Sequence, residues 1–177
     1  FKSEGPAKRR GKFVATPLKV MPYKKVNVRE AERIPFEFSA TATGAAVAAL
    51  SENSGINIGS LCLSKRTFWA INKQAWPAMD HRNLGPPLAV LKSGQSYIFQ
   101  LLNRTPHAHP IHIHGHTFEV LNSNLRHLPA FRADTVLLLP KERIEVGLVA
   151  GRPGEWMYHC HILEHQEAGM MGYITVV

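Results

Sequence analysis

The sequence predicts an all-β sandwich or barrel, and three observations support this fold class. Apolar and polar residues alternate in short segments rich in aromatic and β-branched side chains, as in IPFEFSATA (34–42). Gly and Pro turns separate these segments, as in KSG (92–94) and GRPG (151–154). A chain of 177 residues with 45% apolar composition is also long enough for one domain with its own core.

The expected strands follow one another from residue 34 to the end of the chain. IPFEFSATA alternates apolar and polar residues, and PPLAVL leads into the KSG turn. FRADTVLLL stops at Pro140, and RIEVGLVA stops at the GRPG turn. In chain order the strands are 34–42, 67–72, 86–91, 97–103, 131–139, 143–150, 155–161 and 172–177. The segment GAAVAALSENSG (44–55) is expected to be a loop or a short helix, and no internal repeat is present.

Residues 1–33 differ from the rest of the chain. Lys and Arg outnumber Glu here, three prolines interrupt the segment, and much of the net charge of +8 lies in it. A basic arm of this kind can bind nucleic acid, but no stacking platform or nucleic-acid motif accompanies it. We therefore expect a solvated linker or tail over 1–33, a single domain over 34–177, no nucleic-acid partner and no membrane span. The start at Phe1 indicates that a leader has been removed or that a longer protein precedes this piece.

Two histidine clusters dominate the second half of the chain, HPIHIHG (109–115) and HCHILEH (159–165). Because side chains on a strand alternate between faces, each motif offers ligands to two separate places. One place receives His109 and Cys160, which lie at odd offsets from the other histidines. The other place receives four imidazoles: His112, His114, His159 and His161.

Two further residues complete the first group. His165 comes four residues after His161, so a short helical turn brings it back towards Cys160, and Met170 follows in AGMMG. One thiolate, two imidazoles and a weak thioether form the ligand set of a blue-copper electron-transfer site. Zinc fits less well because structural zinc prefers four strong ligands. Cys62, in GSLCLSK, is expected to be a small buried residue and not a disulfide partner of Cys160.

The four imidazoles of the second group suit copper, iron, nickel or zinc. Their attachment to Cys160 is the informative feature, because it joins a one-electron site to a second metal site through a few backbone bonds. Asp134, in RADTV, is a candidate for orienting a ligand histidine and equally for bracing a turn.

Together, HPIHIHG and HCHILEHQEAGMM resemble the C-terminal cupredoxin domain of multicopper oxidases, the family of laccases and bacterial copper-efflux oxidases. The segments WAINKQAW, LLNRTPHAHPIHIHGHTFEVL and RADTVLLLPKERIEVGL extend the resemblance over residues 34–177. It implies a Greek-key β-sandwich. It implies the following ligands: His109, Cys160, His165 and axial Met170 for type 1 copper, His112 for type 2 copper, and His114, His159 and His161 for the type 3 pair.

The resemblance also implies a laccase-like chemistry. Type 1 copper takes single electrons from a phenol, an aromatic amine or cuprous ion. The catalytic route then runs through Cys160, His159 and His161 to a trinuclear copper cluster that reduces dioxygen to water. Enzymes of this kind are usually exported, so the resemblance implies a periplasmic or secreted location.

The chain departs from the family pattern in ways that bear on its partners. Family members complete the trinuclear cluster with further histidine pairs from an N-terminal domain, and no second HxH pair occurs here. Many bacterial members carry an acidic residue after the position of His165, where this chain has Gln166. We expect N-terminal cupredoxin domains of the same enzyme, or a neighbouring chain, to supply the missing ligands. Two alternatives stay open: an electron carrier with type 1 copper alone, and a trimerising subunit of a small laccase or nitrite-reductase type.

Overall fold

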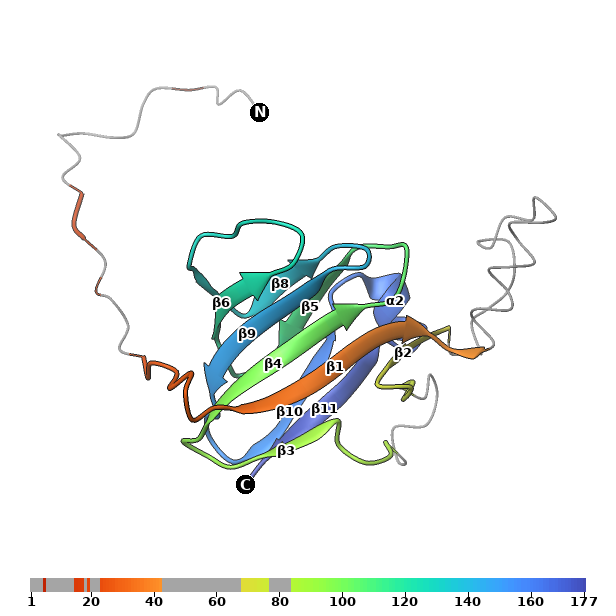
Figure 1. Cartoon of the computed structure of the whole chain (residues 1–177), viewed down its shortest axis with the longest axis horizontal. Helices are drawn as coiled ribbons and strands as arrows, with labels where there is room; N and C mark the ends of the chain where they lie inside the picture. The colour runs from red at the N-terminus through yellow and green to blue at the C-terminus, as the bar shows by residue number, and fades with distance from the viewer. Residues whose placement is uncertain (1–4, 6–14, 18, 20–22, 43–67, 77–83) are drawn as a thin grey trace.

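The computed structural model describes residues 5, 15–17, 19, 23–42, 68–76 and 84–177. Within them the strands in chain order are β1 (Glu32–Ala40), β2 (Trp69–Ile71), β3 (Ala89–Leu91), β4 (Ser96–Asn103), β5 (His109–Ile113), β6 (Phe118–Ser123), β7 (Arg132–Ala133), β8 (Thr135–Leu138), β9 (Arg143–Val149), β10 (Gly154–Cys160) and β11 (Met171–Val176). They form two sheets, with the orders β2-β1-β4-β9-β6-β7 and β3-β11-β10-β5-β8. The two sheets lie one in front of the other, which confirms the expected all-β sandwich (Figure 1).

Each expected strand overlaps an observed strand, with two differences. The segment 131–139 is divided into β7 and β8, because at Asp134 the chain passes from the first sheet to the second. Strand β6 was not among the expected strands, although its sequence FEVLNS follows the first histidine motif directly. The expected loop over 44–55 and Cys62 lie outside the described residues.

The core lies between the two sheets and is rich in aromatic rings. Phe36 of β1 is fully buried, and its ring centroid lies 4.7 Å from that of Phe99 of β4. It also lies 5.0 Å from the ring centroid of Tyr158, which belongs to the opposite sheet. Edge-to-face packing of this kind is favourable beyond the area it buries. Tyr158 comes two residues before Cys160, so the same alternation directs both side chains into the core.

The strands that carry the two histidine motifs are neighbours in the second sheet. β5 pairs with β10 in antiparallel register, so that His112 lies opposite His159 and Ile111 lies opposite Cys160. Between β10 and β11 the chain forms the short helix α2 (Leu163–Glu167), which confirms the helical turn expected around His165. Among the described residues, no helix is long and apolar enough to cross a membrane.

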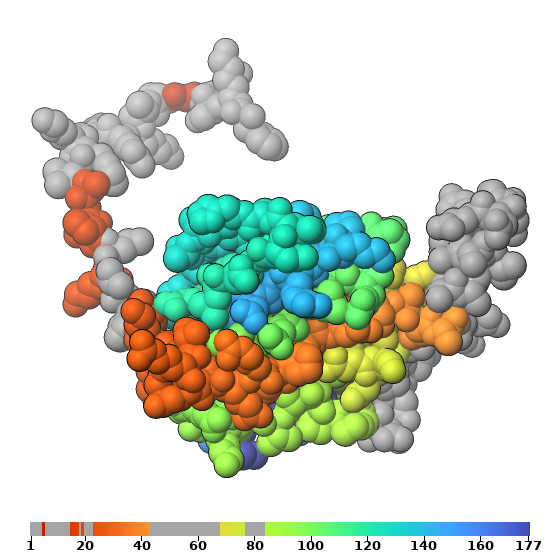
Figure 2. All heavy atoms as spheres, in the orientation of Figure 1, coloured from red at the N-terminus to blue at the C-terminus, as the bar shows by residue number. Residues whose placement is uncertain are grey.

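Residues 23–31, directly before β1, pack against the body of the domain (Figure 2). Val26 and Ala31 are buried and form a small second core with Ile98 of β4. The guanidinium of Arg132 lies 3.6 Å above the centroid of the Tyr23 ring. The regular strand begins at Glu32, two residues before the expected domain start at 34.

Candidate metal centre

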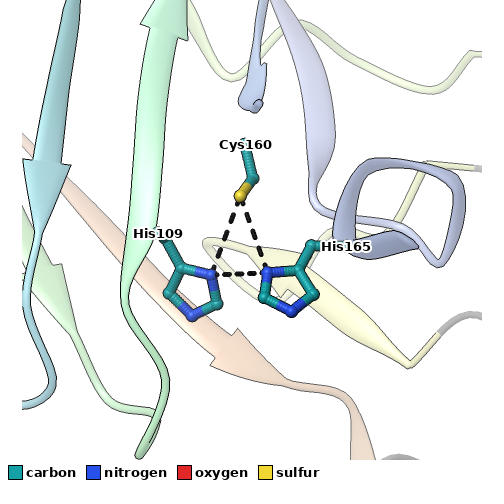
Figure 3. A group of neighbouring side chains, drawn as sticks. All are labelled: His109, Cys160 and His165. Atoms are coloured by element: carbon teal, nitrogen blue, oxygen red, sulfur yellow. Dashed lines mark hydrogen bonds between the residues drawn. The ribbon is translucent and has the colours of Figure 1, made fainter. Parts of the chain in front are cut away.

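Three potential ligand atoms converge at one end of the sandwich, and we refer to His109, Cys160 and His165 as the thiol cluster (Figure 3). The Cys160 Sγ atom lies 3.8 Å from His109 Nδ1 and 3.6 Å from His165 Nδ1. The two Nδ1 atoms are 3.0 Å apart. The residues come from β5, β10 and α2 respectively, so the cluster depends on three separate elements.

Burial sets the protonation of the thiol cluster. Burial, together with the nearby imidazoles of His165 and His107, lowers the pKa of His109 to about 3. Burial also lowers the pKa of His165, with a second contribution from His107, while Glu164 acts in the opposite direction. The imidazoles are therefore neutral at pH 7, as ligands must be.

The thiol behaves differently. Burial raises the pKa of Cys160 to about 11, and the main-chain N–H of Ile162 only partly opposes this. A thiol in this setting keeps its proton unless a cation binds and displaces it. Cys160 is fully buried and is a free cysteine in the described part of the chain, so no disulfide uses it there.

Met170 adds a thioether to the same neighbourhood. It is fully buried, its carbonyl accepts the Cys160 N–H at 3.0 Å, and its own N–H donates to the His165 carbonyl at 2.9 Å. These two main-chain bonds hold Met170 beside two members of the thiol cluster. Met171 is also buried, but it lies in β11 opposite His159 in register.

Trp69 covers the thiol cluster from β2. Its ring centroid lies 5.5 Å from that of His109 and 4.9 Å from that of His165. The exposed ring of His107 lies beside it, 5.7 Å from Trp69 and 6.2 Å from His165. Neither Trp69 nor His107 belongs to a ligand motif, so the sequence alone did not mark them as neighbours of this cluster.

The second group of ligands lies on the opposite face of β5 and β10, and we refer to His112, His114 and His159 as the imidazole cluster. One ring nitrogen from each lies within 4.8 Å of the others, and His114 Nε2 lies 3.0 Å from His159 Nε2. His161 lies beside them, with its ring centroid 5.7 Å from that of His112 and 5.9 Å from that of His159. His159 is buried, whereas His114 and His161 are exposed.

Burial also favours the neutral form of two members of the imidazole cluster. It lowers the pKa of His114, and the rings of His112 and His161 lower that pKa further. Burial likewise lowers the pKa of His159, although its bond to the Cys160 carbonyl opposes the shift. Imidazole nitrogens within a few ångströms of one another form a set that favours a bound cation.

Neighbouring polar groups orient His112. Its Nδ1 atom lies 2.9 Å from Thr135 Oγ1 and 3.0 Å from the carbonyl oxygen of Asp134. The Asp134 carboxylate is farther away, at 3.7 Å, and accepts a hydrogen bond from the Thr135 hydroxyl at 2.9 Å. Asp134 therefore contacts a cluster histidine as the sequence suggested, but mainly through its main chain. These bonds turn His112 Nε2 towards the other imidazoles.

The turn after β5 is held by a tight contact. Gly115 has φ +65°, and a Cβ atom at this position would lie 2.1 Å from the Trp156 ring. His116 then bonds to the His114 carbonyl through Nδ1 at 2.9 Å and accepts the Gly151 N–H at Nε2 at 3.0 Å. Both nitrogens of His116 are thus used in bracing the turn.

The donor atoms fit copper. A buried thiol, two imidazole Nδ1 atoms and an adjacent thioether are soft to intermediate ligands, and this combination is typical of blue-copper sites. The imidazole cluster, with nitrogen donors alone, is compatible with copper as well.

Comparisons with known proteins agree with this chemistry. A family model described as multicopper oxidase matches residues 63–177. The multicopper oxidase MmcO of Mycobacterium tuberculosis is 40% identical over 102 residues, which cover 58% of this chain and 18% of that protein. A laccase of Cryphonectria parasitica is 30% identical over 131 residues, covering 59% of this chain and 21% of that protein.

Solved structures show the same fold. A multi-copper oxidase from Pseudomonas thermotolerans superposes with a TM-score of 0.72 at 33% identity, covering 92% of this chain and 33% of that one. A multicopper oxidase from Campylobacter jejuni, described as a metallo-oxidase, gives a TM-score of 0.65 at 28% identity and covers 93% of this chain and 34% of that one. The chain thus spans about a third of these structures and about a fifth of the curated relatives it matches.

Proposed function

Because the chain belongs to the multicopper oxidase family, whose members use copper, we propose that it is the C-terminal copper-binding domain of a laccase-like oxidase. The complete enzyme would take single electrons from a phenol, an aromatic amine or cuprous ion and use dioxygen as the acceptor. The observation that carries this proposal is the convergence of His109, Cys160 and His165 within the buried end of the sandwich.

We assign the copper ligands by combining the two clusters with the family resemblance. The thiol cluster would hold type 1 copper, with Met170 in the axial position. His112 would bind type 2 copper. Three residues would bind the type 3 pair: His114, His159 and His161.

Copper at the thiol cluster supplies one-electron redox chemistry. The protein contributes a preorganised and dry environment for it. His109, Cys160 and Met170 are fully buried, so their donor atoms need no reordering and compete with no water. The ring of His165 is only half-buried at the domain surface, which makes it the natural point of contact with a reducing substrate.

The covalent structure of β10 links the two clusters. Cys160 points into the core, while His159 and His161 on either side of it belong to the opposite face. An electron accepted at the thiol cluster therefore has a route of a few covalent bonds to the imidazole cluster. Cys160, His159 and His161 are the catalytic residues of this proposal because they carry that route.

The imidazole cluster favours completion by a partner. His114 and His161 are exposed, and the described part of the chain contributes no further histidines to this face. A stand-alone electron carrier would have no use for these residues. We propose that N-terminal cupredoxin domains of the same protein, or a neighbouring chain, cover this face with the missing ligands. A small reducing substrate and dioxygen are the remaining partners.

The copper content of the chain, with its visible spectrum, tests the proposal. We expect the chain alone to hold about one tightly bound copper ion, with an intense visible absorption from the thiolate–copper bond. In the presence of the remaining domains we expect about four copper ions and oxidase activity. If the chain alone forms a trimer in light scattering and binds about four copper ions, the small-laccase alternative is supported.

Cys160→Ser provides the matched variant. We expect it to lose the visible absorption, because serine cannot form the thiolate bond, and to keep the fold, because serine is close in size. Circular dichroism checks the fold. If the visible band persisted in Cys160→Ser, the assignment of Cys160 would be wrong.

We also propose that the enzyme acts outside the cytoplasm, in the periplasm or as a secreted protein. The support for this is the resemblance to exported copper oxidases. Fractionation of the source cells with an antibody to this domain tests it, and a signal confined to the cytoplasm would contradict it.

A further inference from the structure

The buried imidazole of His109 has a second polar neighbour on the side away from Cys160. Its Nε2 atom lies 2.7 Å from the hydroxyl oxygen of Thr105, while its Nδ1 atom faces Cys160 Sγ and His165 Nδ1. His109 is fully buried and Thr105 is 2% exposed. The two ring nitrogens of His109 therefore have separate partners, and the Thr105 contact is shielded from solvent.

Asn103, at the end of β4, fixes the orientation of the Thr105 hydroxyl. Its Nδ2 atom lies 2.7 Å from the carbonyl oxygen of His107, 3.0 Å from that of Leu139 and 3.3 Å from that of Leu138. Carbonyl oxygens only accept hydrogen bonds, so the amide nitrogen must face them. The Oδ1 atom of Asn103 is consequently the one that faces Thr105, where it accepts the Thr105 N–H at 2.8 Å.

The position of the hydroxyl proton follows from this orientation. Thr105 Oγ1 lies 2.8 Å from Asn103 Oδ1 and 3.1 Å from the carbonyl oxygen of His107, and both of these atoms are acceptors only. The hydroxyl therefore gives its single proton to Asn103 or to this carbonyl. The oxygen also accepts the His107 N–H at 3.2 Å, and its remaining lone pair faces His109, which donates from Nε2–H at 2.7 Å.

We propose that Thr105 and Asn103 are positioning residues for the thiol cluster, an inference that rests on the proposed copper function. They hold His109 as the tautomer with hydrogen on Nε2, which leaves the Nδ1 lone pair directed at the metal position beside Cys160. Trp69 packs on the same imidazole with its ring centroid 5.5 Å away and limits its rotation.

Asn103 also connects this arrangement to both sheets. It belongs to β4 in the first sheet, and Leu138, at the end of β8, belongs to the second. Leu138 is in turn the register partner of His109. The buried amide of Asn103 thus links β4 of the first sheet with β8 and the segment before β5 in the second. The position of the His109 ring therefore depends on both sheets and not on β5 alone.

The substitution Thr105→Val keeps the side-chain volume but removes the acceptor for His109 Nε2–H. We expect the copper affinity of the chain to fall about 10–100-fold, as is typical when a hydrogen-bond partner of a ligand histidine is lost. We also expect the reduction potential of the bound copper to rise, because an imidazole that no longer donates a hydrogen bond is less electron-rich. Thr105→Ser should restore both properties, since it restores the hydroxyl.

Thr175→Val is the matched control. Thr175 lies on β11 opposite Glu155, makes no side-chain hydrogen bond among the described residues and belongs to neither cluster. We expect this variant to match the wild type in copper affinity, spectrum and potential.

Two measurements on the full chain test the proposal. Nitrogen NMR on the metal-free chain reports the tautomer of His109, and we expect hydrogen on Nε2 in the wild type and loss of this preference in Thr105→Val. Titration with copper alone, followed by the visible band and by a redox titration, gives affinity and potential. Hydrogen on Nδ1 in the wild type, or wild-type affinity and potential in Thr105→Val, would overturn the positioning role. A wild-type chain that shows the Nε2 tautomer but no thiolate–copper band would instead contradict the proposed function.

Discussion

Met170 shows how much the chemistry of a single residue depends on its neighbours. Its main chain is bonded to Cys160 and His165, and its side chain is fully buried next to the thiol cluster. The resemblance to multicopper oxidases implies Met170 as the axial ligand. The next residue, Met171, lies in register with His159, a member of the other cluster.

Met170→Leu should raise the reduction potential of the bound copper. A thioether that weakly ligates copper helps to set the potential, and a leucine removes that ligand. Redox titration of the visible band measures the effect, and Met171→Leu is a matched control that we expect to leave the potential unchanged. A rise in Met171→Leu with no rise in Met170→Leu would show that the axial assignment belongs to the other methionine.

At the scale of elements, the β8–β9 turn is held by a buried carboxylate. Glu142 is fully buried and accepts hydrogen bonds from Arg126 Nε at 2.8 Å, the Ser123 hydroxyl at 2.6 Å and the Leu139 N–H at 2.7 Å. Ser123 ends β6, and Arg126 lies in the segment that follows it. The carboxylate therefore fixes this segment to the turn.

This arrangement predicts an acid-sensitive contribution to stability. Burial alone would raise the pKa of Glu142, but the hydrogen bonds from Arg126, Ser123 and Leu139 outweigh it, so the pKa is lowered overall. Because the folded-state pKa lies below the unfolded value, Glu142 stabilises the fold fully above its ordinary pKa of 4.5. This contribution is lost as the pH falls through the folded-state pKa.

Urea unfolding at pH 7 and at lower pH measures this contribution. We expect Arg126→Met to lower the free energy of unfolding by about 2 kcal/mol at pH 7. Loss of a partner from a fully buried ion pair would lower it more, but the Arg126 side chain is partly exposed. We expect Glu142→Gln to lose less stability than the wild type on acidification. Glu155→Gln, at an exposed site on β10, should behave as the wild type. An acid response in Glu142→Gln equal to that of the wild type would contradict the role of this carboxylate.

At the scale of the whole molecule, the packed domain begins before residue 34, where the change in residue composition suggested its start. Strand β1 runs parallel to β4, and the segment before it places Val26 and Ala31 against Ile98 on the outer side of the same sheet. The segment 1–33 looked like a uniform basic linker in sequence. Its last part nevertheless contributes buried side chains, because two isolated apolar residues suffice to cover one apolar position on a sheet.

Truncation tests this boundary. A chain that begins at Tyr23 keeps the contacts of Val26 and Ala31, whereas a chain that begins at Ile34 loses them and the first two residues of β1. We expect the shorter chain to be less stable by about 3 kcal/mol, from the apolar area it exposes and the strand pairing it loses. The free energy of urea unfolding measures the difference. Equal stabilities of the two truncated chains would place the domain boundary at residue 34.

The sequence by itself determined the fold class and the division of the ligands into two groups. Alternation along a strand is a local, covalent property, so the separation of His109 and Cys160 from His112, His114 and His159 could be predicted without any knowledge of strand pairing. The turn that returns His165 towards Cys160 was predictable for the same reason, because a short helical turn depends on neighbouring residues.

Only the tertiary structure decided which residues surround those ligands. Thr105 and Asn103 meet His109 because the end of β4, the start of β5 and the end of β8 lie together, and Trp69 reaches His109 from β2. These contacts join residues from separate strands whose side chains carry no motif, so no local pattern marks them. The candidate ligands follow from spacing along the chain, whereas their orientation and protonation follow from long-range packing, which the spacing of residues does not encode.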